Sequence, residues 1–459
     1  MSTTPNTDEA VRHAFGRDAS GLELLPEAVA RPESAQEVVE ILRAATATRT
    51  PLTPAGGQSS TTAASITDRG ILLSLRALDR IIDIDADRRT VRVQPGVSVA
   101  AVRRAAAEHG LLFAPDPTSE EEATIGGALA CNASGARSLR YGTTRDHALA
   151  LSVALASGEI IELRRARLEK NTVGYAMAQD PIDWFIGSEG TLGVIVEAEF
   201  ALLPLPSSVT GLAIPFESEA DALCFVVAAR ESRAVSARCL EYFDHGAIDI
   251  VRDASGHDGW NLGGAGAALV YCEEAGGDDT ADALERWVEL ADRHDARMAD
   301  ARAFESEAEL REARRLRHAV PACMNERGAA FRANGGRKVS TDWAVPFRGL
   351  HEAIVAARAA AGRQGIAQPV IYGHAGNGHP HENFIARDAS ELVAVERAVA
   401  ETLHHVLHAG GTVAAEHGIG KLKRRWLPLQ MSELQIRAMR SLKEALDPLG
   451  ILAPGNVLP

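Results

Sequence analysis

Histidines that could bind a metal are concentrated in one short segment, Gly373–Asn383, which reads GHAGNGHPHEN. The residues on either side are typical of strands and those between favour a turn, so a β-hairpin is predicted. His374 and His381 would then face each other across the turn, and period-2 alternation places His379 and Asn383 on the face of His381. Two facing imidazoles are suitable ligands for a divalent metal, with a carboxylate and an open position completing the site. Ordinary polar packing is the alternative for these histidines.

A second segment, residues 416–420, reads EHGIG and supplies the carboxylate that such a site lacks. Glu416 is the candidate ligand, and His417 follows it directly. An imidazole has a reference pKa of ~6.5, so it can accept a proton at neutral pH.

Glycine-rich loops form a third group of candidate site residues. Residues 54–60 read PAGGQSS and offer consecutive backbone N–H groups with hydroxyls, the material of an anion-binding nest. The loop has neither the G-x-G-x-x-G of a dinucleotide-binding turn nor a Walker pattern, so a plain glycine turn is an equally good interpretation. TIGG at 124–127, NASG at 132–135 and GSEGTLG at 187–193 follow in order, and three such blocks favour a flat, uncharged contact surface for a ligand.

Alternating helices and short strands must position these loops. The capping pattern at Ser34–Glu37 and the apolar spacing after it predict an amphipathic helix over 34–48. Further predicted strands are 71–75, 81–84, 90–93, 194–198, 267–271 and 370–372, and further predicted helices are 98–109, 281–297, 305–317 and 432–446. Pro204-Leu-Pro206 separates the glycine-rich part from a second region richer in Ala, Arg and Glu.

Composition excludes several classes of protein. The chain has 459 residues, 46% hydrophobic and 24% charged, with a net charge of −14 and 40 glycines, which indicates a globular protein that repels nucleic acid. The five cysteines are widely spaced and suggest reduced thiols rather than a disulfide or iron–sulfur framework. No signal peptide or transmembrane segment is recognised, so a cytoplasmic protein is expected, peripheral to a membrane at most through its electron acceptor.

Taken together, the glycine blocks resemble the FAD-binding domain of the vanillyl-alcohol oxidase / p-cresol methylhydroxylase (PCMH) superfamily. The second half resembles the branch that contains D-lactate dehydrogenases, a glycolate oxidase component and D-2-hydroxyglutarate dehydrogenases. The resemblance implies an α+β fold with a two-part PCMH-type FAD-binding domain over 1–206 and an α+β cap (substrate) domain with the metal hairpin over 207–412. Residues 413–459 are then expected to pack back on the FAD domain.

The resemblance also implies which residues contact the cofactor. Non-covalent FAD is expected, because no His or Cys stands in the first loop to tether it. The chain departs from the family at Ala55 and Gln58, where Arg and Gly are more usual, which leaves the contacts of that loop less defined. The cofactor contacts carried over are Gly56, Gly57, Gln58, Ser59, Thr118, Thr124, Gly127, Asn132, Gly135, Glu189, Gly190, Val194 and Asn456.

For the second region, the resemblance implies metal ligands, a base and substrate contacts. His374, His381 and Glu416 match the metal ligands, with Zn²⁺ expected first and Mn²⁺ or Fe²⁺ as alternatives, and His417 matches the catalytic base. Arg317 and Asn383 are expected to bind substrate, since a guanidinium binds a carboxylate bidentately. His379 departs from the family pattern, and its role as an extra ligand or a substrate contact stays open.

The expected function is oxidation of a small D-2-hydroxy acid to the 2-oxo acid, with hydride transfer to the flavin. Ser340 stands where the 2-hydroxyglutarate enzymes carry a Lys, so a D-lactate-like substrate is favoured, although Lys338 is two residues away. A quinone, a cytochrome or an electron-transfer flavoprotein would accept the electrons, and a homodimer is one expected assembly. A metal-dependent hydrolase and a flavin-binding subunit of a larger oxidase are the alternatives.

Overall fold

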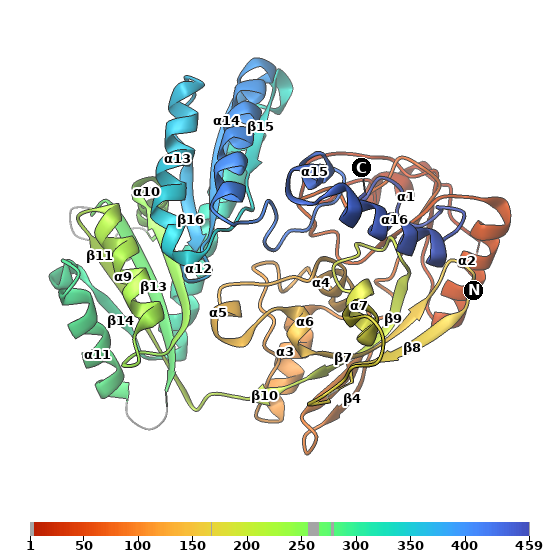
Figure 1. Cartoon of the computed structure of the whole chain (residues 1–459), viewed down its shortest axis with the longest axis horizontal. Helices are drawn as coiled ribbons and strands as arrows, with labels where there is room; N and C mark the ends of the chain where they lie inside the picture. The colour runs from red at the N-terminus through yellow and green to blue at the C-terminus, as the bar shows by residue number, and fades with distance from the viewer. Residues whose placement is uncertain (1–3, 167, 256–265, 277–279, 459) are drawn as a thin grey trace. The chain divides into compact units, whose positions relative to one another are not determined.

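The computed structural model describes residues 4–166, 168–255, 266–276 and 280–458, and the chain divides into two compact units. The first unit comprises Met1–Gly135, Gly142–Leu205 and Glu416–Pro459, and the second comprises Ala136–Tyr141 and Pro206–Ala415. Both units combine helices with sheets, which confirms the predicted mixed fold class (Figure 1).

A five-stranded antiparallel sheet forms the main core of the first unit. In spatial order its strands are β4 (Ile81–Asp85), β5 (Thr90–Val93), β9 (Val194–Ala201), β7 (Ala148–Ala154) and β8 (Ile160–Arg164). Alternate residues of β5, β7 and β9 are buried, as expected for a sheet with one covered face. Apolar residues of α3 (Val99–Glu108) and α4 (Ile125–Cys131) pack in the same hydrophobic cluster, so α4 is held directly against this sheet.

A small parallel sheet carries the first glycine loop. Its order is β1 (Ala28–Ala30), β3 (Ile71–Ser74), β2 (Leu52–Ala55), and the predicted helix forms α2 (Ala35–Thr48). The Ser34 side chain accepts the backbone N–H of Glu37, which is the expected N-cap bond. Because β2 ends at Ala55, the loop that begins at Gly56 leaves the end of a buried strand.

The other elements of the first unit are short, apart from the C-terminal helix. They are α1 (Glu9–Ala14), β6 (Leu111–Leu112), α6 (Thr144–His147), α7 (Ala176–Gln179), α8 (Ile182–Phe185), β10 (Leu203–Pro204), η5 (Arg424–Trp426), α15 (Leu427–Gln430) and α16 (Glu433–Leu446). Ser432 caps α16 through a capping box with Gln435, and Leu442 and Leu446 pack on the main cluster of the unit.

The second unit is built on a sheet in which seven strands are described. In spatial order they are β14 (Arg302–Phe304), β11 (Ser208–Phe216), β13 (Ala268–Gly276), β12 (Ala237–Asp244), β16 (Val370–His374), β17 (His379–Asp388) and β15 (Gly335–Ser340). β16 and β17 form the predicted hairpin, with η4 (Ala375–Asn377) as the turn. Its register pairs His374 with His379 and Tyr372 with His381.

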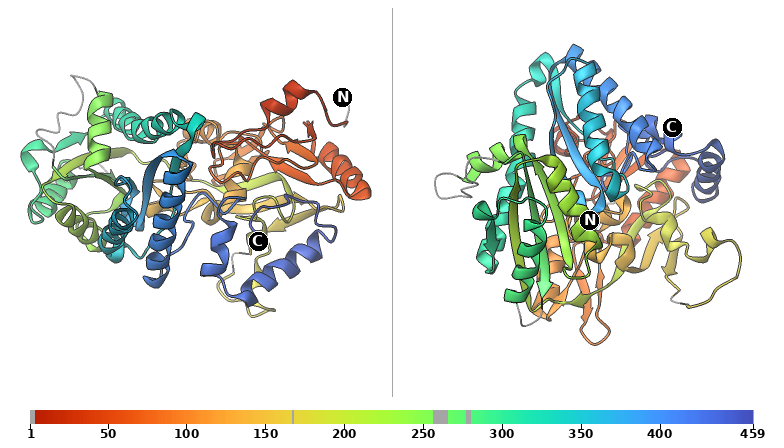
Figure 2. Two further views of the ribbon diagram at one scale, coloured as in Figure 1. Left: turned by 90° about the horizontal axis from the view of Figure 1, so that it is seen from above. Right: turned by 60° about the vertical axis from the view of Figure 1, so that its left-hand side comes forward.

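Helices cover this sheet and fix the site-bearing strands. α10 (His245–Ser255) and α12 (Glu307–Ala329) share one hydrophobic cluster with residues of β12, β13, β16 and β17. α13 (Leu350–Arg363) and α14 (Ala389–His408) pack side by side (Figures 1 and 2). The remaining elements are α5 (Ser138–Tyr141), α9 (Glu219–Glu231), α11 (Thr280–Asp292), η1 (Met298–Asp300), η2 (Arg332–Asn334) and η3 (Phe347–Gly349).

Two predicted helices differ in length from the observed ones. α11 ends at Asp292 rather than at 297, and Asp295 then takes a positive φ of 56°, which a continuing helix does not allow. α12 continues to Ala329, twelve residues past the predicted end at 317, although Pro321 lies inside it. Its apolar side chains stay buried along its length, and this packing outweighs the hydrogen bond that Pro321 removes. Within the described ranges, no helix has the length and apolar character needed to cross a bilayer.

Candidate active site

The first glycine loop presents a row of backbone donors. Within the described part of the chain, the N–H groups of residues 56–60 donate no hydrogen bond to the protein. Arg76 donates from Nε to the Gly56 carbonyl (3.1 Å) and from Nη2 to the Gly57 carbonyl (2.7 Å). In a trans peptide the N–H points opposite to the C=O, so the N–H groups of Gly57 and Gln58 point away from Arg76. Gln58 has a φ of 56°, and the loop therefore has the donors and the bend of an anion-binding nest.

This backbone arrangement fits the phosphate end of a dinucleotide such as FAD. The side chain of Gln58 does not contribute, because its Nε2 donates to the carbonyls of Phe15 (2.8 Å) and Arg17 (3.1 Å). Only the backbone of Gln58 therefore faces the nest. Arg76 was not recognised in the sequence, since nothing in the local pattern links it to a loop twenty residues earlier.

The first loop packs tightly on the TIGG block, as the predicted shared role requires. A Cβ at Gly56 would lie 2.2 Å from Thr124 Oγ1, and one at Gly57 would lie 1.8 Å from the Glu122 carbonyl oxygen. Thr124 caps α4 by accepting the N–H of Gly127 (3.3 Å). These two glycines are therefore required by the close approach of two protein segments, and not only by a ligand.

The other predicted cofactor residues follow α4 or stand just before it. Asn132 caps the C-terminus of α4 with a φ of 51°, and its Oδ1 accepts the N–H of Arg145 (2.9 Å). A Cβ at Gly135 would lie 2.1 Å from the Asp116 carbonyl oxygen, so Gly135 allows another close backbone approach. Thr118 is exposed, and Ser59 is half-buried.

The GSEGTLG block lies against the end of α4 and leads into β9, whose first residue, Val194, is buried. The N–H of Glu189 donates to the Ala130 carbonyl (2.9 Å), and a Cβ at Gly190 would lie 2.4 Å from Pro54 Cγ. The Glu189 carboxylate accepts the N–H groups of Ile419 (2.6 Å) and Gly420 (2.7 Å). Burial raises the pKa of Glu189 to about 7, against the opposing effect of these two donors.

Asn456 joins several loops of the first unit. Its Nδ2 donates to the carbonyls of Ala64 (2.9 Å) and Glu189 (3.2 Å), while its Oδ1 accepts Lys421 Nζ (2.7 Å). Burial lowers the pKa of Lys421 to about 8. These contacts give Asn456 a role within the protein, and its expected cofactor contact stays a prediction.

Glu416 and His417 stand at the start of the C-terminal segment of the first unit. His417 Nε2 lies 3.3 Å from Glu416 Oε1, and Ser134 Oγ donates to Glu416 Oε2 at 3.4 Å. The Glu416 side chain is 9% exposed and that of His417 is 27% exposed. His417 is therefore partly exposed, and its expected role as a base stays a prediction.

In the second unit, the hairpin brings three histidines together. The ring centroids of His374, His379 and His381 lie 4.7 to 5.5 Å apart, and all three side chains are buried. Each offers a ring nitrogen within 4.8 Å of the others. The prediction that His379, His381 and Asn383 share a face of β17 is confirmed for the two histidines by this geometry. Convergent imidazole nitrogens are a donor set that Zn²⁺ prefers.

A buried carboxylate on β12 orients the first of these histidines. His374 Nδ1 lies 2.6 Å from Glu241 Oε1, so Nδ1 carries the hydrogen and Nε2 is the nitrogen suited to bind a metal. Burial alone would raise the pKa of the Glu241 carboxyl, but the charge of Arg317 and the His374 ring hold it well below its usual range. Glu241 was not predicted, although a Glu inside the apolar run CLEYF was a usable signal.

Arg317 reaches the same carboxylate from α12. Its Nε donates to Glu241 Oε2 (2.5 Å), and its Nη2 lies 3.4 Å from His374 Nδ1. The Arg317 side chain is 11% exposed. The guanidinium predicted to bind substrate is thus held beside the predicted metal ligand His374.

Asp342 and Asn383 complete the polar surroundings of the histidines. His379 Nε2 lies 3.1 Å from Asp342 Oδ1, and both side chains are buried. Asn383 Nδ2 donates to the carbonyls of His381 (2.9 Å) and Val370 (3.3 Å), and within the described residues its buried Oδ1 accepts no hydrogen bond. The histidines, the carboxylates behind them and this acceptor together fit a divalent metal.

Two further features of the second unit bear on charge. Lys338 Nζ donates to Asn325 Oδ1 (3.0 Å), and burial lowers the pKa of Lys338 to about 8.

Arg137 forms a bidentate pair with Glu273 (2.9 and 2.8 Å), which Arg238 also approaches to 3.4 Å. Arg137 comes from the short segment 136–141, whose sequence lies between two blocks of the first unit.

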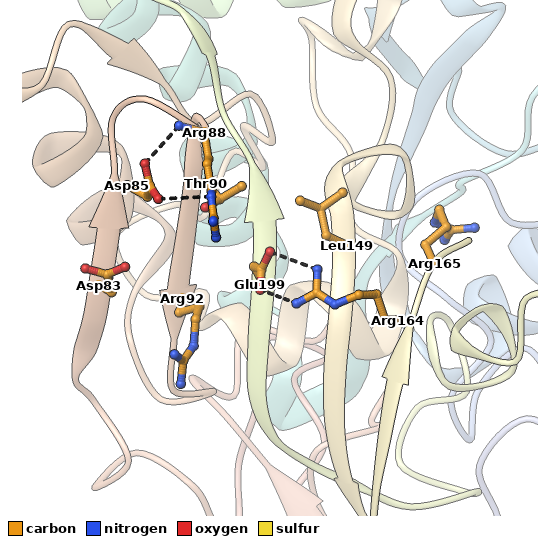
Figure 3. Close-up of a pocket in the computed structure, with 9 residues that line it drawn as sticks. All are labelled: Asp83, Asp85, Arg88, Thr90, Arg92, Leu149, Arg164, Arg165 and Glu199. Atoms are coloured by element: carbon orange, nitrogen blue, oxygen red, sulfur yellow. Dashed lines mark hydrogen bonds and ion pairs between the residues drawn. The ribbon is translucent and has the colours of Figure 1, made fainter. Parts of the chain in front are cut away.

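A separate hollow lies on the five-stranded sheet of the first unit (Figure 3). Its charged side chains pair with one another or with neighbours: Arg92 with Glu197 (2.8 Å), Arg164 with Glu199 (2.6 Å) and Arg165 with Asp183 (2.7 Å). None of the predicted site residues lines it. The residues around it are Asp83, Asp85, Arg88, Thr90, Arg92, Leu149, Arg164, Arg165 and Glu199.

Comparison with known proteins assigns both halves of the chain. Residues 26–164 match the FAD binding domain, and residues 205–457 match the C-terminal domain of FAD linked oxidases. Glycolate oxidase subunit GlcD of Bacillus subtilis is 31% identical over 468 residues, covering 100% of this chain and 95% of the relative. D-2-hydroxyglutarate dehydrogenase of Xanthomonas citri is 32% identical, covering 94% and 89%. D-lactate dehydrogenase of Archaeoglobus fulgidus is 30% identical, covering 94% and 91%.

Solved structures support the fold. p-Cresol methylhydroxylase has a TM-score of 0.74 at 16% identity, covering 98% of this chain and 93% of that chain. Alkyldihydroxyacetonephosphate synthase also has a TM-score of 0.74, at 19% identity, covering 99% and 83%. At these identities the likeness establishes the architecture and nothing about the substrate.

Proposed function

The chain belongs to the family of FAD-linked oxidases, and from that premise we propose that it oxidises a small D-2-hydroxy acid to the corresponding 2-oxo acid. The observation that carries the proposal is the match over nearly the whole chain to enzymes named for glycolate, D-2-hydroxyglutarate and D-lactate. A D-lactate-like substrate is favoured, because Ser340 replaces the Lys expected for the 2-hydroxyglutarate enzymes. The glycine loops and the histidine cluster support the same conclusion.

The cofactor contacts are proposed on the first unit. The N–H groups of Gly56 to Ser59 and the blocks at 124–135 and 187–194 would bind non-covalent FAD, which supplies the two-electron oxidation when it is bound. In this role the loop at 56–60 acts through its backbone, and Arg76 keeps its carbonyls turned away from the ligand.

The substrate contacts are proposed on the second unit. The Arg317 guanidinium would bind the substrate carboxylate, while Glu241 fixes its Nε and so limits its rotamers. Asn383, whose buried Oδ1 accepts no hydrogen bond within the described residues, is proposed as a further substrate contact.

A divalent metal, Zn²⁺ first and Mn²⁺ or Fe²⁺ as alternatives, would be held by His374, His381 and Glu416 and would lower the pKa of a hydroxyl bound to it. We assign His379 as a further ligand, because its ring lies 4.7 Å from that of His381 and it offers a nitrogen close to those of the other two histidines. The N–H of Ala415, the residue before Glu416, donates to the Asp342 carbonyl (2.8 Å). The chain is therefore fixed beside Asp342 immediately before the proposed carboxylate ligand.

His417 is the proposed base. A neutral ring that donates from Nε2 to Glu416 has Nδ1 as its basic nitrogen, and this atom would take the proton of the substrate hydroxyl. An external acceptor then reoxidises the flavin, and a quinone, a cytochrome or an electron-transfer flavoprotein all satisfy this requirement.

The test is anaerobic titration of the purified protein with D-lactate, glycolate, D-2-hydroxyglutarate and longer hydroxy acids. We expect a yellow protein whose flavin absorbance is bleached by one of them. His417→Ala should retain the flavin and be bleached at least about 100-fold more slowly. A folded but colourless wild-type protein would contradict the proposal, and rapid bleaching of His417→Ala would remove His417 from the role of base.

A second candidate is a catalytic subunit that needs a partner to turn over, because two relatives are named as subunits of glycolate oxidase. Dye reduction by the isolated chain separates the two. Sustained turnover with an artificial acceptor supports an independent enzyme, whereas bleaching without turnover supports the second candidate.

A further inference from the structure

We propose that Glu189 is a positioning residue that holds the loop carrying His417 in place, rather than a residue that contacts the cofactor. The proposal rests on the proposed function for the role of His417 as base. The hydrogen bonds that hold Ile419, Gly420 and Lys421, in contrast, join residues of the first unit and are independent of that role.

The Glu189 carboxylate binds the loop with both oxygens. Oε1 accepts the N–H of Ile419 at 2.6 Å and Oε2 accepts the N–H of Gly420 at 2.7 Å. Bonds of this length to an ionised acceptor are stronger than bonds between neutral groups. Each oxygen already has a backbone donor in the protein, so the carboxylate is committed to the loop at the second and third residues after His417.

The backbone on both sides is shaped for this contact. Glu189 has a φ of 51°, a conformation that L side chains seldom adopt and that persists where the surroundings enforce it. Gly418 has a φ of 73°, and a Cβ there would lie 2.6 Å from Glu189 Oε1. A side chain at position 418 would therefore push the carboxylate off the loop.

The far end of the loop is fixed by the first glycine-rich segment. The Thr62 carbonyl accepts the N–H of Lys421 (2.9 Å), and a Cβ at Gly420 would lie 2.2 Å from the same oxygen. Thr62 Oγ1 also donates to the His417 carbonyl (3.4 Å). His417 is thus held between two loops that precede it by more than two hundred residues.

The burial of Glu189 has no other evident purpose. Its side chain is 5% exposed and has no Arg partner among the described ion pairs. Burying a carboxylate in this way is costly unless hydrogen bonds compensate it, and the two loop N–H groups offset part of that cost. An uncharged side chain of similar size would be sufficient at position 189 if the residue only filled space beside a cofactor.

The test compares Glu189→Gln with Glu197→Gln, a matched change at a half-buried carboxylate of the same unit that pairs with Arg92. An amide at 189 presents one NH₂ group to a backbone donor, so one of the two bonds must break. Amide hydrogen exchange of the purified full chain should become about 10-fold faster or more at Ile419 and Gly420 in Glu189→Gln, and stay at the wild-type rate in Glu197→Gln. Unchanged exchange elsewhere shows that the variant is folded.

Gly418→Ala supplies an independent test from the other side of the contact. It should accelerate exchange at the same two amides, and in both variants flavin reduction by substrate should slow with kcat falling more than KM rises. Wild-type exchange at 419–420 in both variants overturns the proposal, as does loss of flavin with normal exchange. Since exchange is measured without substrate, a protein that no hydroxy acid bleaches would refute the proposed function and leave this result standing.

Discussion

In the first unit, the proposed cofactor loop offers backbone N–H groups and almost no charge, whereas the histidine cluster of the second unit is surrounded by buried charged side chains. The loop at 56–60 depends on the φ of Gln58 and on two carbonyls held by Arg76. The cluster depends on Glu241, Arg317 and Asp342. A site formed by backbone N–H groups depends on the conformation of its loop, whereas a site formed by charged side chains depends on the ion-pair partners of those side chains. Variants should therefore damage the two regions in different ways.

The largest effect is expected where the second unit buries charge most deeply. Glu273→Gln leaves Arg137 and Arg238 without their carboxylate and should lower the free energy of unfolding by about 3–5 kcal/mol. Thermal or urea unfolding measures it. Glu274→Gln is the control and should cost less, because this neighbouring carboxylate accepts the N–H groups of Trp287 and Ser236 and has an arginine only at 3.8 Å.

The same pair predicts a pH dependence. Burial raises the pKa of Glu273, but Arg137 and Arg238 outweigh it and lower the pKa from 4.5 to about 2. The stabilisation is therefore complete above pH 4.5 and is lost as the pH falls through about 2. The wild type should lose more stability than Glu273→Gln between these values. If the free energy of unfolding had the same pH dependence in the wild type and in Glu273→Gln, the Glu273 carboxylate would not be ionised in the folded state.

A smaller effect is expected behind the histidines. Glu241→Gln keeps the shape of the side chain but removes the charge that orients His374 and Arg317, and should weaken metal binding by about 10–100-fold. Metal analysis during titration with a chelator measures this. Flavin content should be unchanged, because Glu241 belongs to the second unit. Equal loss of flavin and metal would contradict the separation of the two regions.

A milder effect is expected for the backbone site. Arg76→Met releases the carbonyls of Gly56 and Gly57, lets the loop rotate and should weaken flavin binding by about 10-fold. Arg69→Met, at an exposed arginine that pairs with Asp68, is the control. Flavin release on dilution provides the measurement, and equal affinities would show that the loop keeps its shape without Arg76.

The smallest effect concerns Gln58, which the sequence assigned to the cofactor. Its side chain donates to Phe15 and Arg17, so Gln58→Ala should cost about 1 kcal/mol of stability and change flavin affinity less than about threefold. A large loss of flavin affinity with normal stability would show that the Gln58 side chain contacts the cofactor after all.

Local patterns were sufficient to predict much of the fold. The helix over 34–48 and the hairpin over 370–385 depend on capping, periodicity and turn residues, which neighbours in sequence determine. The partners of the site residues were not predictable in this way. Glu241 meets His374 because β12 pairs with β16, and Asp342 meets His379 because β15 pairs with β17, and neither pairing is visible in a short segment. Conversely, α12 is longer than predicted, because tertiary packing compensates for the hydrogen bond that Pro321 removes.

The division of the chain limits how the enzyme can be dissected. The chain passes from one unit to the other after Gly135, Tyr141, Leu205 and Ala415, so neither unit is a single stretch of sequence. A fragment ending near residue 205 would lack the segment with Glu416, His417 and Asn456, and a fragment of 206–415 would lack Arg137 and leave Glu273 without its main partner. Exchanging the second unit between relatives therefore requires transplanting the six residues 136–141 with it.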